Sequence, residues 1–214
     1  MTIYICRMIN TISKFNFLIT IIFLNSSMLM AQKYETQEYQ VIDQIDNAEI
    51  RFYPSAAMIK VSAEQNRNNN FGKLFRYITG NNQENQEIAM TTPVYMYDQN
   101  KTMEFVLPKK YLSEGLPIPN DKDLEAYITS PKYFAAIRYS GYSNANKIQK
   151  HRNELKSILE NNGLEIISDF YVLSYDAPTK FYNRRNEILF EISYKDWILI
   201  LENSKKRTTQ ISFL

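Results

Sequence analysis

The chain has 214 residues, with 25 Lys and Arg, 23 Asp and Glu, five Gly, one His and one Cys. A hydrophobic content of 44%, including 14% aromatic residues, is enough for a packed core and excludes wholesale disorder. The single cysteine excludes a disulfide framework and a cysteine-based zinc site, and the net charge of +2 gives no electrostatic case for a nucleic-acid partner.

Residues 1–31 are typical of a secretory signal peptide. Arg7 and Lys14 precede an apolar run at residues 15–24, and polar residues follow before Ala31. The run is shorter than the roughly 20 apolar residues that span a bilayer, so we expect no stable membrane span after cleavage. We therefore expect export to the periplasm or the exterior, with cleavage after Ala31. An uncleaved membrane anchor is the alternative.

Short alternating segments follow, and they predict a first group of strands around one helix. The strands are expected at residues 39–45, 48–53, 56–62, 93–97 and 103–107. Phe71, Leu74, Phe75 and Ile78 have the spacing i, i+3, i+4 and i+7, which predicts a helix with one apolar face. Gly80 is expected to end this helix in a left-handed conformation.

The second half repeats this order. Strands are expected at residues 124–130, 133–139, 166–175 and 187–192. Ile148, Leu155, Ile158 and Leu159 define the apolar face of a second helix, which Ser143 or Asn144 can cap and Gly163 ends.

Two such units cannot bury their sheets separately. The repeated order therefore predicts an α+β fold of duplicated β-β-α-β-β units, forming a distorted antiparallel β-barrel flanked by two helices. We expect one domain over residues 32–195 and a C-terminal extension over residues 196–214, with an extra strand considered at residues 196–201.

Seven short segments resemble motifs of the SOUL haem-binding family. They are residues 49–53, 71–82, 88–94, 105–108, 117–121, 175–178 and 184–187. Each is weak alone, but together their order and spacing are specific, and they extend over nearly the whole chain after the signal. The resemblance implies the same duplicated barrel and the binding of haem or a related porphyrin, without established catalysis.

The first helix is the expected binding groove. Haem presents a large apolar face and two carboxylates, so its site needs an apolar wall and one or two cations. The expected site residues are Phe71, Lys73, Leu74, Phe75, Arg76 and Ile78. The resemblance implies that haem lies against this helix with basic residues at its propionates. The alternative is that the stripe faces the core and the two cations form a solvated edge.

The sequence does not define an iron ligand. The resemblance implies a histidine in some family members where this chain has Phe52, which cannot bind iron. His151, the single histidine, lies on the apolar side of the second helix and is interpreted as a hydrogen-bonded core residue rather than a ligand. Met90 and the tyrosines are other candidates, and none is singled out.

The sequence favours a binding protein over an enzyme. It contains no GxSxG elbow and no phosphate-binding glycine loop. Glu104, Glu187 and Glu191 are the acids considered for a carboxylate pair in a pocket. Arg184 and Arg185 form either an anion clamp or a turn whose arginines pair with nearby acids; we favour the turn.

We therefore expect an exported, non-catalytic protein that binds haem or another flat hydrophobic ligand, for buffering, scavenging or delivery. One alternative is a protein-interaction module of the same fold without haem. Another is a small-molecule-binding or hydrolytic barrel. The oligomeric state is not indicated.

Overall fold

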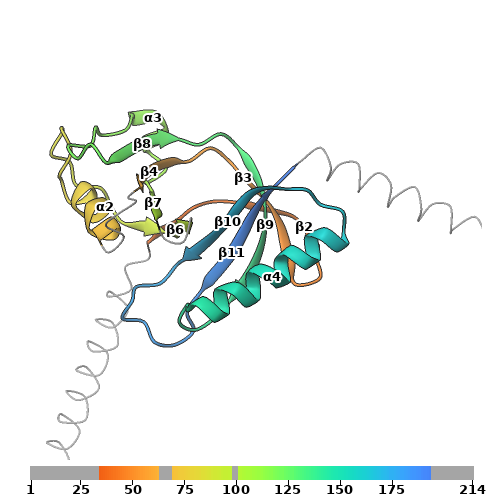
Figure 1. Cartoon of the computed structure of the whole chain (residues 1–214). Coiled ribbons are helices and arrows are strands. Elements are labelled where there is room, and N and C mark those ends of the chain that lie inside the picture. The colour runs from red at the N-terminus through yellow and green to blue at the C-terminus, as the bar shows by residue number, and fades with distance from the viewer. Residues whose placement is uncertain (1–33, 63–68, 98–100, 194–214) are drawn as a thin grey trace, which may run out of the picture. The chain divides into compact units, whose positions relative to one another are not determined.

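The structure is a computed structural model that describes residues 34–62, 69–97 and 101–193 (Figure 1). The chain divides into two compact units, Met1–Tyr34 and Glu35–Leu214, and the elements below all belong to the second. The expected signal peptide and the segment at residues 196–201 lie outside the described residues.

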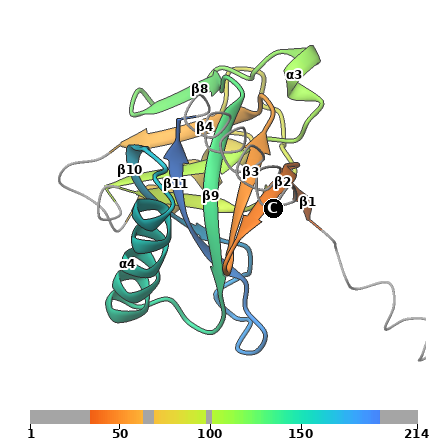
Figure 2. The same ribbon diagram turned by 90° about the vertical axis from the view of Figure 1, so that its right-hand side faces the viewer.

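A nine-stranded antiparallel sheet forms the centre of this unit (Figures 1 and 2). Its strands are β2 (Gln40–Ile45), β3 (Ala48–Tyr53), β4 (Ala57–Ser62), β6 (Val94–Tyr97), β7 (Thr102–Val106), β8 (Leu124–Ile128), β9 (Lys132–Tyr139), β10 (Ile166–Ser174) and β11 (Asn186–Ile192). They are ordered β2-β3-β9-β11-β10-β6-β7-β4-β8. Two short strands, β1 (Glu35–Thr36) and β5 (Thr91–Thr92), pair in parallel beside it.

Two helices pack on one face of the sheet. α2 (Asn70–Ile78) contacts β4 and β7, and α4 (Ala145–Asn161) contacts β9, β10 and β11. Asn144 caps α4 by accepting a hydrogen bond from the Lys147 amide at 2.9 Å. Gly80 (φ 106°) and Gly163 (φ 68°) follow the two helices in the left-handed conformation, as the sequence predicts. The third helix, α3 (Tyr111–Glu114), is a single turn.

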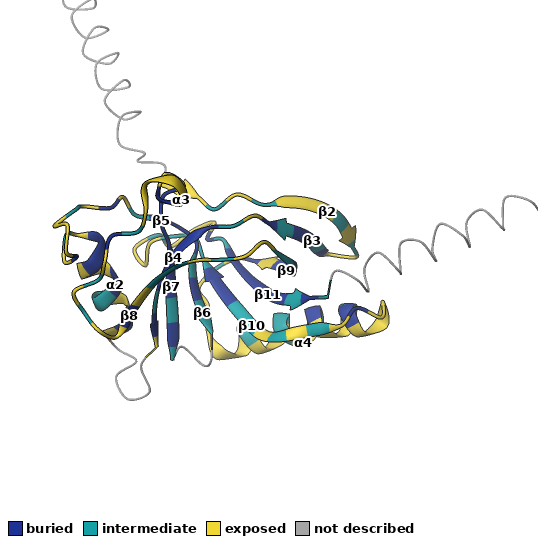
Figure 3. Ribbon diagram, turned by 90° about the horizontal axis from the view of Figure 1, so that it is seen from above, coloured by how far each residue is buried: buried dark blue, intermediate teal, exposed yellow. Residues whose placement is uncertain are grey.

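The strand residues alternate between two faces. On the helix face, Ile50 and Ile188 pack under α4, while Ile59 and Phe105 pack under α2. Figure 3 shows that both helices have buried inner sides and exposed outer sides. The opposite face, which we call the tyrosine face, carries an aromatic cluster that includes Tyr53, Tyr95, Tyr127, Tyr171 and Tyr175.

The sheet curls toward its tyrosine face. Met58 on β4 and Phe134 on β9 lie in strands that are five places apart in the sheet order, yet they belong to one buried cluster. The hydrogen-bonded order still has two ends, at β2 and β8, so the described residues show an α+β fold with a large antiparallel sheet and not a closed barrel. Closure and internal duplication stay predictions.

Candidate functional site

The predicted apolar face of α2 separates into a buried part and an exposed part. Leu74 and Ile78 are buried in the core beneath the helix, with Tyr77 beside them. Phe71 and Phe75 are 45% and 46% exposed, and their rings stack at 5.9 Å with an interplanar angle of 14°. The rings of Phe71 and Phe105 make an edge-to-face contact with their centroids 5.3 Å apart. A flat apolar surface is therefore open to solvent on this helix.

The two predicted cations differ in their position around α2, since Lys73 lies about 160° from Phe75 around the helix and Arg76 about 100° from it. Arg76, in the last turn of α2, is exposed. Lys73 forms an ion pair with Asp123, which precedes β8. Arg76 is thus the more available partner for an anion, while Lys73 would have to exchange Asp123 for one.

Two polar side chains near the C-terminal end of α2, those of Tyr77 and Asn82, bond backbone carbonyls of the protein. The Tyr77 hydroxyl donates to the Pro117 carbonyl at 2.7 Å. The buried Asn82 amide donates to the carbonyls of Tyr77 (3.1 Å) and Gln86 (2.8 Å). The Asn82 bond satisfies a carbonyl in the last turn of α2, and the Tyr77 bond ties the helix to the segment at Pro117.

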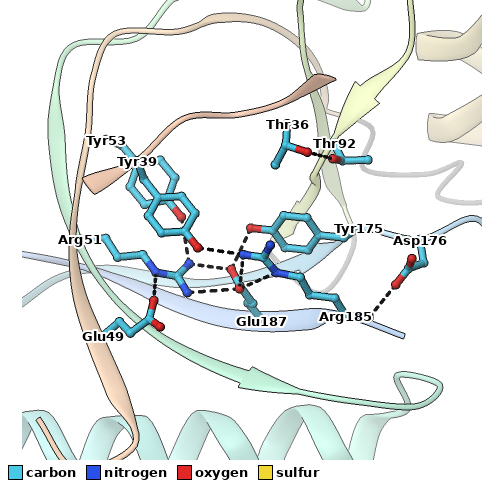
Figure 4. A network of polar contacts seen from close by, with 10 residues as sticks. All are labelled: Thr36, Tyr39, Glu49, Arg51, Tyr53, Thr92, Tyr175, Asp176, Arg185 and Glu187. Atoms are coloured by element: carbon cyan, nitrogen blue, oxygen red, sulfur yellow. Dashed lines mark hydrogen bonds and ion pairs between the residues drawn. The ribbon is translucent and has the colours of Figure 1, made fainter. Parts of the chain in front are cut away.

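A buried ionic network lies on the tyrosine face (Figure 4). Arg51 on β3 donates to both oxygens of the Glu187 carboxylate, at 2.7 and 3.2 Å. Arg185 and Tyr175 also donate to Glu187. Burial alone would raise the pKa of Glu187, but the bond and charge of Arg51 and the charge of Arg185 hold that pKa below its usual range. Both carboxylate oxygens are thus occupied by donors of the protein.

Arg184 and Arg185 are both bonded within the protein, but among the described residues only Arg185 has the expected acidic partner. Arg184 donates to the carbonyls of Ala177 and Lys180 at 2.8 and 2.7 Å. The Arg185 guanidinium contacts Glu187 and the hydroxyl of Tyr39. The bonds of Arg185 occupy its Nε and Nη2 atoms, while Arg184 is buried and its Nε has no hydrogen-bond partner.

A cavity of about 220 Å³ lies elsewhere on the tyrosine face. Glu104 on β7 lines it, together with aromatic rings from β3, β6, β8, β9 and β10. Neither Glu187 nor Glu191 lines this cavity, so it does not contain a carboxylate pair from the three acids considered above.

A larger cavity of about 600 Å³ lies between β1, the start of β4 and α3. Its charged lining consists of Glu35, Glu38 and Lys109. The backbone amide of Lys109 donates to Glu35 and its ammonium pairs with Glu38, each at 2.7 Å. The site therefore has excess negative charge, which opposes the carboxylates of haem.

The interpretation of His151 as a hydrogen-bonded residue is confirmed. It is half-buried on α4, its Nδ1 lies 3.0 Å from Glu154, and its ring stacks on Tyr139 at 4.8 Å. Phe52 packs on Tyr133 with ring centroids 5.1 Å apart. Within residues 34–62, 69–97 and 101–193, no group of three or more His, Cys, Asp or Glu side chains is arranged to hold a metal ion.

The family model described as SOUL heme-binding protein matches residues 34–191. The chain belongs to the SOUL haem-binding family. This SOUL protein is 28% identical to human heme-binding protein 2 over 156 residues, covering 65% of this chain and 75% of the relative. It is 27% identical to heme-binding protein 1 of Xenopus tropicalis over 128 residues, covering 55% and 66%.

Solved structures resemble the SOUL chain more distantly. The C-terminal domain of EcmrR has a TM-score of 0.46 and 14% identity, covering 72% of this chain and 98% of that one. A hydrolase from Listeria innocua has a TM-score of 0.49 and 7% identity, covering 79% and 97%. Neither supports a statement about function. No helix in the described part of the SOUL chain has the length and apolar character needed to cross a membrane.

Proposed function

We propose that this SOUL protein is an exported, non-catalytic haem carrier that holds the porphyrin against α2, for buffering, scavenging or delivery. Membership of a haem-binding family supports the ligand class. The observation that carries the position of the site is the exposed Phe71–Phe75 stack beside Arg76. A flat macrocycle can cover the two rings while the guanidinium bonds a propionate.

Size and charge favour α2 over the two cavities. A volume of about 220 Å³ is below the ~300–1,000 Å³ typical of sites for drug-sized ligands, and haem is at the large end of that class. The larger cavity has sufficient volume, but Glu35 and Glu38 would repel the propionates. On α2 the exposed Arg76 directly follows Phe75 and carries the opposite charge to a propionate.

Haem titration tests the position of the site. We expect a saturable one-to-one shift of the Soret band with the full chain. Phe75→Ala should weaken haem binding at least fivefold, because the side chain is half exposed and its loss removes half of the stacked surface. Arg76→Ala should weaken it about twofold to tenfold, and the difference should shrink at high salt because the contact is exposed.

Matched variants separate this site from a general surface effect. Phe181→Ala removes a phenyl ring that is 75% exposed far along the chain, and Lys150→Ala removes an exposed cation from α4; both should leave the affinity unchanged. His151→Ala should also leave the Soret band unchanged. A saturable shift that Phe75→Ala and Arg76→Ala do not weaken would contradict the α2 site. No saturable shift at all would favour the interaction-module alternative.

Export rests on the apolar run at residues 15–24 and on Ala31. When the full chain is produced in a Gram-negative host, we expect the periplasmic fraction to contain a protein that starts at Gln32, as measured by intact mass. Ala31→Tyr should block processing, because signal cleavage requires a small residue before the cut. Recovery of the unmodified chain with full-length mass in the membrane fraction would instead identify a membrane anchor.

A further inference from the structure

The cavity around Glu104 is separate from the proposed haem site and contains none of its residues. It is open to solvent near Ile128, which is half exposed, and Ser130, which is exposed, at the link between β8 and β9. Glu104 itself is 5% exposed and lies deeper among the rings. The cavity therefore connects a buried carboxyl group with the surface.

The Glu104 carboxyl group is satisfied on one oxygen only. The hydroxyls of Tyr97 and Tyr127 donate to its Oε1 atom at 2.9 and 3.1 Å. Among the described residues, no donor bonds its Oε2 atom. Burial raises the pKa of Glu104, and the two tyrosine bonds with the charges of Lys60 and Lys132 offset this effect only in part. A buried carboxylate without an ion-pair partner is stabilised when a cation binds beside it.

The nearby lysines are already paired with other acids. Lys60 lies directly across the ladder from Glu104, but its ammonium contacts Glu125 at 2.7 Å. Lys132 contacts Glu191 at 2.7 Å. Lys132 also lines the cavity, with its ammonium held by Glu191, whereas Glu104 has no ion-pair partner of its own among the described residues. Glu187, the other acid buried on this face, is bonded by two arginines.

The remaining walls suit a cation that carries an apolar group. The rings that line the cavity are Tyr53, Tyr95, Tyr127, Phe134 and Tyr171. Aromatic faces attract ammonium groups, and most strongly in desolvated sites. A cavity of roughly 150 Å³ holds benzene, so about 220 Å³ has room for one ring and a small cationic head.

We propose that this cavity binds a small organic cation of the aryl-alkyl ammonium class, with Glu104 as its counter-ion and the tyrosine rings as its walls. The ligand enters between β8 and β9, and its ammonium replaces the missing partner at Oε2 of Glu104. The cation site and the α2 haem site use no residue in common, so the full chain holds both ligands independently.

Calorimetry with the full chain and benzyltrimethylammonium tests this proposal. The cation should bind saturably, while benzyl alcohol and phenylacetate, which are neutral and anionic probes of similar size, should bind at least tenfold more weakly. Glu104→Gln keeps the shape and an acceptor for the tyrosines and should weaken cation binding at least tenfold. Glu160→Gln, the same change at an exposed ion-paired position on α4, should have no effect.

Each contrary result identifies a different failure. Equal affinity for the cation and benzyl alcohol would show an apolar cavity without a role for charge. Unchanged cation affinity in a folded Glu104→Gln protein would remove Glu104 from the site. If that variant does not fold, the ligand selectivity of the unaltered chain decides the question. Displacement of haem by the cation would overturn the separation of the two sites, whereas failure of haem binding alone leaves the cation site intact.

Discussion

Glu187→Gln is expected to lower the free energy of unfolding by about 3–5 kcal/mol at neutral pH. Glu187 is fully buried, and Arg51, which is 2% exposed, bonds both of its oxygens. The substitution leaves the guanidiniums of Arg51 and Arg185 without a buried counter-charge, and the new amide group faces them with its own hydrogens. Urea unfolding followed by circular dichroism measures the loss.

Because the pKa of Glu187 is lowered in the folded protein, its contribution to the free energy of unfolding depends on pH. A carboxyl group with a lowered folded-state pKa stabilises the protein fully above its unfolded pKa of about 4.3, and that contribution is lost as the pH falls through the lower folded value. The unaltered chain should therefore lose stability as the pH falls below about 5. The stability of Glu187→Gln should depend less on pH in this acidic region.

The matched control is Glu104→Gln, which neutralises a second buried glutamate. Its pKa is raised by burial, so its ionised form is a cost to the fold at neutral pH rather than a gain. We expect this variant to lose less than about 1 kcal/mol. Equal losses for the two variants would contradict the distinction between a paired and an unpaired carboxylate.

Leu74→Ala is expected to cost about 2–5 kcal/mol, because it creates a cavity in the core beneath α2. Phe75→Ala on the same helix should cost only about 1 kcal/mol, since nearly half of that side chain is already exposed. Haem affinity should show the opposite order at temperatures where both variants are folded. Urea unfolding and Soret titration on the same samples measure the two effects.

A contrary result here would change the view of α2. If Leu74→Ala retained full stability and lost haem binding, Leu74 would be a direct contact residue, as the uniform apolar stripe suggests. If Phe75→Ala proved as destabilising as Leu74→Ala, the aromatic pair would belong to the core.

The strands and helices of the fold could be predicted from the sequence because the local signals agree. Alternation along Ala48–Tyr53 and helical spacing along α4 placed these elements within a few residues. Whether the curled sheet closes depends on pairing between segments that are distant in sequence. The alternation of apolar and polar residues identifies strands but not their pairing partners. It therefore could not decide whether the sheet closes into a barrel.

The spacing on α2 could not separate its exposed phenylalanines from its buried residues. At about 100° per residue, Tyr77 lies about 160° from Phe75 around the helix. The burial of Tyr77 against Pro117 centres the core side on Leu74 and turns Phe75 toward solvent. The Glu104 cavity was also missed, because its rings come from five strands. The signal available was an acid alternating with the apolar residues of β7.

Strands from the N-terminal and C-terminal halves of the chain pair with one another, and this pairing determines whether a fragment of the protein can fold. β3 pairs with β9, and β8 pairs with β4, so each half completes its part of the sheet with a strand that the other half supplies. Such long sequence separations make the sheet slow to assemble and strongly cooperative. A fragment ending before Lys132 keeps β3 without its inner neighbour and exposes an unpaired edge, a surface on which other chains can add. We therefore expect neither half to fold independently.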